Sequence, residues 1–113
     1  MKYALLICTD EVAYAALSPE EAAQNFAAYQ RFMERNASKI LGGERLRDTT
    51  EATTVQVKDG KVITGDGPFA ETKEQMGGFY LVEAADLDEA IQLASEIPSA
   101  KQGTIEVRPV WEM

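Results

Sequence analysis

The chain has 113 residues, of which 45% are hydrophobic and 27% charged, and its formal net charge at pH 7 is −8. This length and composition predict one globular domain over residues 1–113 and argue against a disordered or fibrous chain. The negative charge, together with the lack of any run of lysine and arginine, predicts no nucleic-acid partner, because such a surface repels phosphate groups.

The apolar stretch of residues 3–8 is too short for a signal peptide or a membrane span, and Asp10 and Glu11 follow it closely. We therefore expect a cytoplasmic protein with no membrane partner. Both alternating sets of side chains in this stretch are apolar, which predicts a strand over residues 3–9 that is covered on both faces. Cys8, the single cysteine, is expected to be a small buried side chain.

A first helix is predicted to begin at Ser18, because Pro19 and Glu21 follow it in the order of a capping box. The glycine pair at positions 42 and 43 supplies a stop. Its apolar stripe, expected in the core, consists of Ala22, Phe26, Tyr29, Met33 and Ala37. A further short strand is predicted between Glu44 and Arg47.

The pair Asp59 and Gly60 separates two β-branched runs, at residues 53–57 and 61–64, which predicts a hairpin with positive φ at its turn. Residues 78–83 return to a strand. Asp86 then caps a second helix that ends at Pro98, and the chain closes with an alternating strand over residues 104–110. The stripe of the second helix consists of Leu87, Ala90, Ile91, Ala94 and Ile97.

This order predicts an α+β fold, a ferredoxin-like layer in which two helices lie on one face of a mostly antiparallel sheet. The hairpin at Asp59 and Gly60 is inserted between the two halves. Because the helices cover one face only and the strands carry apolar residues on both, the second face requires a cover. A second copy of the chain is the simplest one, so we expect a homodimer.

Residues 66–79, with the sequence DGPFAETKEQMGGF, combine turn residues and charges in one connector. Together with the start MKYALLI and the end GTIEVRPV, they resemble the DGPF-domain family, which is related to the YCII proteins. The resemblance covers nearly the whole chain and implies a dimeric α/β barrel, in which two sheets pack face to face around polar clefts. It also implies a histidine and aspartate catalytic pair, of which this chain can match only Asp66.

Two interpretations of the connector remain open. In the first it is an ordered loop that fixes strand register: Gly67 before Pro68 forms a tight bend, residues 72–76 form a helical turn, and the glycine pair at 77 and 78 allows close backbone approach. In the second it carries a site. Asp66, Glu71 and Lys73 then point into a cleft, which Glu106 and Arg108 reach from the last strand.

In that site Asp66 or Glu71 would transfer a proton, and Arg108 would hold the carboxylate or phosphate of a small anionic ligand. Glu106 and Arg108 could equally form a structural ion pair across the dimer interface. Tyr80 and Trp111 are candidates to line the cleft or to be buried at the dimer contact. Arg45 and Arg47 are candidates to meet an anion or to be solvated.

The chain contains no histidine, which excludes Ser-His and Cys-His nucleophiles and any histidine-ligated metal site. No glycine-rich phosphate loop is present, so no cofactor and no metal are expected. Three functions remain: an enzyme of lyase or isomerase type acting on an anionic metabolite, a non-catalytic ligand-sensing module, or a dimeric scaffold. The resemblance supports the second, because family members are joined to sigma factors of the extracytoplasmic-function type.

Overall fold

The computed structural model describes residues 1–112, which form an α+β fold with a mostly antiparallel sheet, as predicted. The order of the main sheet is β2-β5-β1-β6, and every neighbouring pair in it is antiparallel. Its strands are β1 (Lys2–Thr9), β2 (Ile40–Arg45), β5 (Gln75–Glu83) and β6 (Thr104–Pro109). The helices are α1 (Glu11–Ala15), α2 (Pro19–Arg35) and α3 (Leu87–Glu96), with the 3₁₀ turns η1 (Thr49–Glu51) and η2 (Pro98–Lys101).

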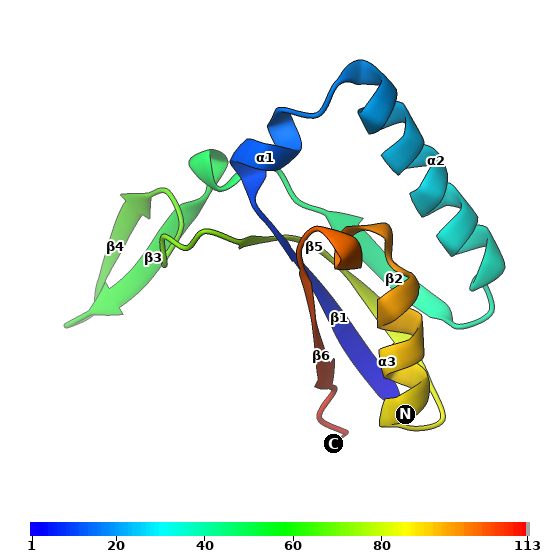
Figure 1. Ribbon diagram of the computed structural model, residues 1–113. Helices are drawn as coiled ribbons and strands as arrows, with labels where there is room; N and C mark the ends of the chain where they lie inside the picture. The colour runs from blue at the N-terminus through cyan, green and yellow to red at the C-terminus, as the bar shows by residue number, and fades with distance from the viewer. Residues whose placement is uncertain (113) are drawn as a thin grey trace.

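The core lies between one face of this sheet and the helices α2 and α3 (Figure 1). Tyr3 and Leu5 alternate along β1 and are buried on this face, and Val82 of β5 lies opposite Tyr3. The intervening residues of β1 and β5 point to the other face, where they are only half-buried. The helix side of the core is made by Phe32, Ala90, Leu93, Ala94 and Ile97.

Helix α2 begins with the predicted capping box. The Ser18 hydroxyl accepts a hydrogen bond from the Glu21 amide at 3.1 Å, and the Glu21 carboxylate accepts one from the Ser18 amide at 3.0 Å. The predicted stop at the glycine pair is wrong. The helix ends at Arg35 with Asn36 as its cap, and both glycines lie in β2.

The predicted apolar stripe of α2 is also wrong in part, because Phe26 is 65% exposed and Met33 is 41% exposed. The inner face instead follows Asn25, Tyr29, Phe32 and Asn36 at helical spacing, with Phe32 fully buried. Two asparagines and a tyrosine weaken the hydrophobic signal of this face. In the same way, Leu93 of α3 is buried, whereas the predicted Leu87 and Ile91 are about half exposed.

Helix α1 was not predicted from the sequence. Asp10 caps it, because its carboxylate accepts hydrogen bonds from the amides of Val12 and Ala13. The predicted strand at residues 44–47 corresponds only to the end of β2, and the predicted helical turn at 72–76 is wrong, since β5 starts at Gln75. These errors come from short segments, where five residues carry too little pattern to identify an element.

The predicted hairpin is confirmed as β3 (Thr53–Lys58) and β4 (Lys61–Asp66), with φ of 51° at Asp59 and 76° at Gly60. It forms a two-stranded sheet of its own and stands away from the main sheet (Figure 1). At its base the Gly67 amide donates to the Ala52 carbonyl at 2.8 Å, and the φ of 89° at Gly67 turns the chain into the connector.

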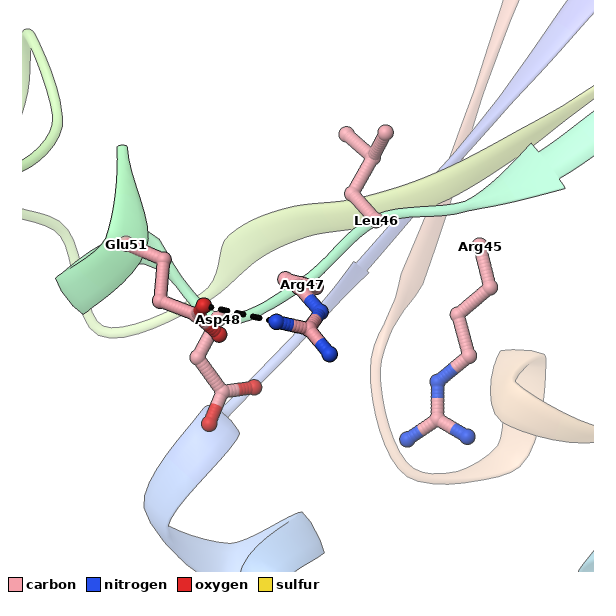
Figure 2. Close-up of a pocket in the computed structure, with 5 residues that line it drawn as sticks. All are labelled: Arg45, Leu46, Arg47, Asp48 and Glu51. Carbon is pink, nitrogen blue, oxygen red and sulfur yellow. Dashed lines mark hydrogen bonds and ion pairs between the residues drawn. The ribbon is translucent and has the colours of Figure 1, made fainter. Parts of the chain in front are cut away.

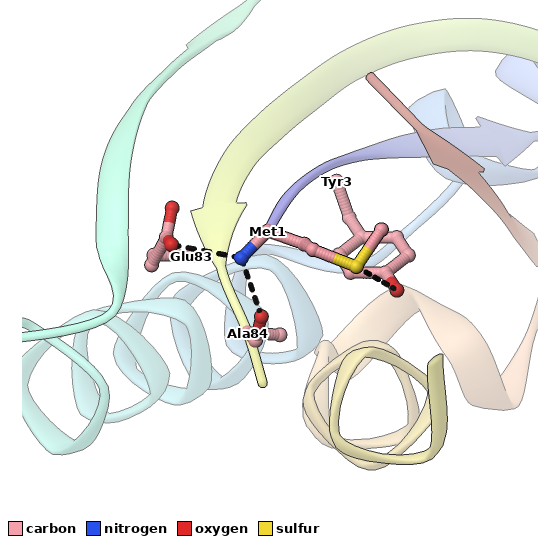
Figure 3. Close-up of polar contacts among 4 residues, drawn as sticks. All are labelled: Met1, Tyr3, Glu83 and Ala84. Carbon is pink, nitrogen blue, oxygen red and sulfur yellow. Dashed lines mark hydrogen bonds and ion pairs between the residues drawn. The ribbon is translucent and has the colours of Figure 1, made fainter. Parts of the chain in front are cut away.

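The beginning of β1 is fixed to the end of β5. The Met1 ammonium group donates to the Glu83 carboxylate at 2.9 Å and to the Ala84 carbonyl at 3.0 Å (Figure 3). The Ala84 amide returns a bond to the Met1 carbonyl. Among the described residues, no helix has both the length and the apolar character that spanning a bilayer requires.

Candidate functional site

Three tyrosines from three elements lie along the inner face of α2: Tyr14 of α1, which Asn25 contacts, Tyr29 of α2 itself, and Tyr80 of β5, which packs on Phe32. The Tyr29 hydroxyl lies 2.6 Å from the Ser99 hydroxyl, and the Tyr14 hydroxyl accepts a hydrogen bond from the Asn25 side chain at 2.6 Å. The Tyr80 ring packs on the core residue Phe32, with the ring centroids 5.3 Å apart. The core therefore supports the Tyr80 ring, while hydrogen bonds fix the hydroxyls of Tyr14 and Tyr29.

Arg45, the last residue of β2, joins this group, because its guanidinium carbon lies 5.5 Å from the centroid of the Tyr14 ring. That distance is within the range of a cation–π interaction. We define the tyrosine cluster as Tyr14, Asn25, Tyr29, Arg45 and Tyr80. Its members come from α1, α2, β2 and β5, so only the folded chain brings them together.

Burial sets the protonation of two of these phenols. It raises the pKa of Tyr29, an effect that the hydrogen bond between Tyr29 and Ser99 opposes, and it likewise raises the pKa of Tyr80, with Tyr29 adding to the shift. The groups that act on these two pKa values are tyrosine hydroxyls, the hydroxyl and backbone of Ser99, and Arg45. Both phenols are therefore hydrogen-bond donors at neutral pH.

Glycines make room for this arrangement. Gly43 lies opposite Tyr80, and a Cβ at Gly43 would be 2.5 Å from the Phe79 carbonyl oxygen and 2.8 Å from the Tyr80 ring. A Cβ at Gly78 would be 2.9 Å from the Glu44 carbonyl oxygen, so the close backbone approach predicted for Gly77 and Gly78 is confirmed at Gly78. At Gly77 the nearest atom is the Thr9 hydroxyl oxygen at 3.9 Å, an ordinary contact distance. The β2–β5 pair thus depends on glycine on both strands.

Helix α1, which carries Tyr14, is tied to the turn η1. The Glu11 carboxylate accepts hydrogen bonds from the Thr49 amide at 2.8 Å and from the Thr49 hydroxyl at 2.7 Å. Thirty-eight positions separate the two residues in the sequence. This two-point contact fixes the helix that bears Tyr14 against the segment that follows Arg45.

A surface depression of about 360 Å³ adjoins the cluster at Arg45 and is drawn in Figure 2. Arg45 and Arg47 extend to the same side of the chain, away from Leu46. Both arginines are exposed, but Arg47 is paired with Glu51 at 3.0 Å, whereas Arg45 lies beside the Tyr14 ring. Of the two arginines, Arg45 is the one available to a ligand in the cluster. The depression is lined by Arg45, Leu46, Arg47, Asp48 and Glu51.

One chain does not assemble the five charges predicted for the cleft. Asp66 ends β4 opposite Thr53, and Glu71 and Lys73 lie exposed in the connector. Glu106 and Arg108 form an ion pair of 3.8 Å within β6, and no hydrogen bond or ion pair in the described part of the chain joins them to the first three. Their convergence between two copies remains a prediction.

Tyr80 and Arg45 were candidates from the sequence, whereas Tyr14 and Tyr29 were missed. Tyr29 had been assigned to the core stripe of α2, and Tyr14 lies on the unpredicted α1. The capping pattern of Asp10 was the signal that could have indicated this helix. Trp111, expected to line a cleft or a dimer contact, is 85% exposed.

Comparisons with known proteins support the YCII-related part of the resemblance in the sequence. The family model of the YCII-related domain matches residues 1–113. An uncharacterized protein of Rhizobium meliloti (strain 1021) is 43% identical over 116 residues, which cover 97% of this chain and 92% of the relative.

A solved structure has the same fold. It is 5-chloro-2-hydroxyhydroquinone dehydrochlorinase from Burkholderia phenoliruptrix AC1100, in complex with 2,5-dihydroxybenzoquinone. The match has a TM-score of 0.58 and 19% identity, and it covers 99% of this chain and 94% of the dehydrochlorinase. At this identity the likeness is one of fold.

Proposed function

This chain belongs to the YCII-related domain family, and on that premise we propose that it binds a small, anionic, oxygen-rich ring compound in the tyrosine cluster. We propose further that it acts on this compound as an enzyme of lyase or isomerase type. The observation that carries the proposal is the convergence of three tyrosines and Arg45 from separate elements.

The chemistry of the cluster favours a ligand that brings its own negative charge. Tyr29 and Tyr80 keep their protons at neutral pH and can donate to ligand oxygens, while Arg45 supplies a cation. The ring faces of the tyrosines suit a planar ligand. A hydroxyquinone or an enolate combines these properties.

The same groups would assist a reaction in which charge develops on oxygen. Donors and a cation held in place before the reaction stabilise an enolate or phenolate more strongly as its negative charge grows. Loss of a proton or of a leaving group next to a ring carbonyl is a reaction of this kind. The dehydrochlorinase that shares the fold supports this class, because its structure holds a dihydroxybenzoquinone.

For the assembled protein we propose a ferredoxin-like layer and a homodimer that forms through the sheet face opposite the helices. Ala4, Leu6, Phe79 and Leu81 are half-buried on that face, with Ala4 paired to Leu81 and Leu6 to Phe79. Such an apolar centre on a sheet face favours a protein cover. The second copy would also bring Asp66 or Glu71 to the ligand, where either carboxylate could transfer a proton.

The test is titration calorimetry of the full chain with 2,5-dihydroxybenzoquinone. We expect binding by the native chain and at least a tenfold loss of affinity in Arg45→Gln, because a charge-assisted contact is worth about 1.5–3 kcal/mol. Arg31→Gln is the matched control, an exposed arginine on α2, and should bind as the native chain does. Equal affinity in both variants would place the ligand elsewhere.

An enzyme can be distinguished from a ligand-sensing module by analysing the 2,5-dihydroxybenzoquinone that is recovered after incubation with the protein. An enzyme returns a changed compound, and Tyr29→Phe should slow its appearance. Ligand that binds and is recovered unchanged would favour the alternative, a regulatory or ligand-sensing module of the kind linked to sigma factors.

A further inference from the structure

The hairpin of residues 53–66, which we call the arm, presents one apolar face to solvent. Val57 lies opposite Val62, and Val55 follows on the same face two residues from Val57. The three side chains are 62%, 67% and 69% exposed for Val55, Val57 and Val62. We call these three residues the valine face.

This face is not covered by its own chain, because the arm is a separate two-stranded sheet that projects from the rest of the molecule (Figure 1). A two-stranded hairpin alone is at best marginally stable in water. The radius of gyration is 16.0 Å, whereas a compact domain of this length has about 13 Å. The marginal stability of an isolated hairpin and the large radius of gyration indicate that another surface covers the valine face.

The charges of the arm favour a second copy of this chain as that surface. Lys58 and Lys61 lie opposite each other next to the turn, which itself holds Asp59, so two lysines outnumber one carboxylate and the tip carries a net positive charge. The chain as a whole has a formal net charge of −8. The positive charge of the tip is complementary to the acidic surface of another copy. In a dimer with a two-fold axis, each arm would contact the other copy in the same way.

We propose that the valine face of each arm docks on the other copy of this chain, with Lys58 and Lys61 near its carboxylates. This rests on the proposed dimer and adds a second contact to it, separate from the open sheet face. The arms would then clasp the dimer, and residues 53–66 would be buried only in the assembled protein.

Sedimentation of the full chain tests the clasp. Val→Thr at positions 55, 57 and 62 keeps the β-branched shape and the strand propensity while removing apolar surface. We expect the dimer dissociation constant to rise roughly three-thousandfold, because the two arms together lose six methyl groups worth about 0.8 kcal/mol each when buried. Ile63→Thr, on the opposite face of the arm, is the control and should leave the constant unchanged.

The outcomes separate the two proposals. A triple variant that dimerises as the native chain does overturns the clasp and leaves the sheet-face dimer in place. A native chain that is monomeric overturns both. A monomer that sediments with phosphatidylglycerol vesicles through the arm would assign the valine face to a membrane surface and overturn the clasp.

Zero-length cross-linking of a mixture of ¹⁴N- and ¹⁵N-labelled chains gives an independent result. We expect cross-linked peptides of mixed isotope composition that join Lys58 or Lys61 to aspartate or glutamate. Lys39, which pairs with Glu89 of its own chain at 3.6 Å, should give peptides of one isotope and is the internal control. The clasp would be contradicted if every cross-linked peptide that contains Lys58 or Lys61 carried a single isotope.

Discussion

The guanidinium carbon of Arg45 lies 5.5 Å from the centre of the Tyr14 ring, and this contact joins the end of β2 to the short helix α1. The same tyrosine accepts a hydrogen bond from Asn25 of α2. One ring therefore connects three elements, and the energies of its contacts can be measured separately.

A double-mutant cycle should find coupling between Arg45 and Tyr14. Arg45→Gln and Tyr14→Leu are expected to couple by about 0.5–1 kcal/mol in urea unfolding, the size of an exposed cation–π interaction. The same cycle with Arg47→Gln, whose partner is Glu51, should be additive. Equal coupling in the two cycles would show that the ring contact is not specific to Arg45.

Alanine at Gly43 should be destabilising, and alanine at Gly42 should not. A Cβ at Gly43 would press on the Phe79 carbonyl and the Tyr80 ring, whereas nothing lies within 4 Å of a Cβ at Gly42. We expect a loss of about 1–3 kcal/mol for Gly43→Ala in urea unfolding, together with weaker ligand binding because Tyr80 must move. Similar stabilities of the two variants would refute the close approach.

The contact of Glu11 with Thr49 should stabilise the position of α1. Glu11→Gln keeps one acceptor oxygen and should cost less than Glu11→Ala, for which we expect about 1–2 kcal/mol. Glu34→Gln, an exposed change on α2, is the control for loss of charge. Amide hydrogen exchange of residues 11–15 should accelerate in Glu11→Ala, and unchanged exchange there would show that the helix is held by other contacts.

Stability should fall at alkaline pH because of Tyr29 and Tyr80. Burial raises both pKa values above the ordinary 10.0, so the unfolded chain loses these protons first. The contribution is complete below pH 10 and is lost as the pH rises through the folded pKa values. The urea midpoint should decline above about pH 10, and less steeply in Tyr29→Phe. If the urea midpoints of the native chain and of Tyr29→Phe decline in parallel, Tyr29 does not contribute to the loss of stability.

Strands β1, β5 and β6, the two longer helices α2 and α3, and the hairpin could be predicted because each has a local cause. Asp59 and Gly60 specify a turn with positive φ, and Ser18 with Glu21 specifies a helix start. The inner face of α2 could not be predicted in this way. Asn25 and Tyr29 on this face contact Tyr14 and Ser99, which lie on a helix too short to recognise or far away in the sequence.

The candidate site was harder to predict than the fold for the same reason. The connector at residues 66–79 predicts a site from the sequence because its charges and turn residues are contiguous. The tyrosine cluster has no contiguous signal, since Tyr14, Arg45 and Tyr80 are each isolated in the sequence. Only the pairing of β2 with β5, and the return of α1 toward η1, bring these residues together.

The strand order also constrains how the chain can fold during synthesis. β1 is made first, yet both of its neighbours, β5 and β6, lie after residue 74. Pairings between such distant segments form slowly, and an unpaired apolar strand is prone to aggregate. A ribosome must therefore release about two thirds of the chain before its first strand can be paired, and this interval is when a chaperone would be needed.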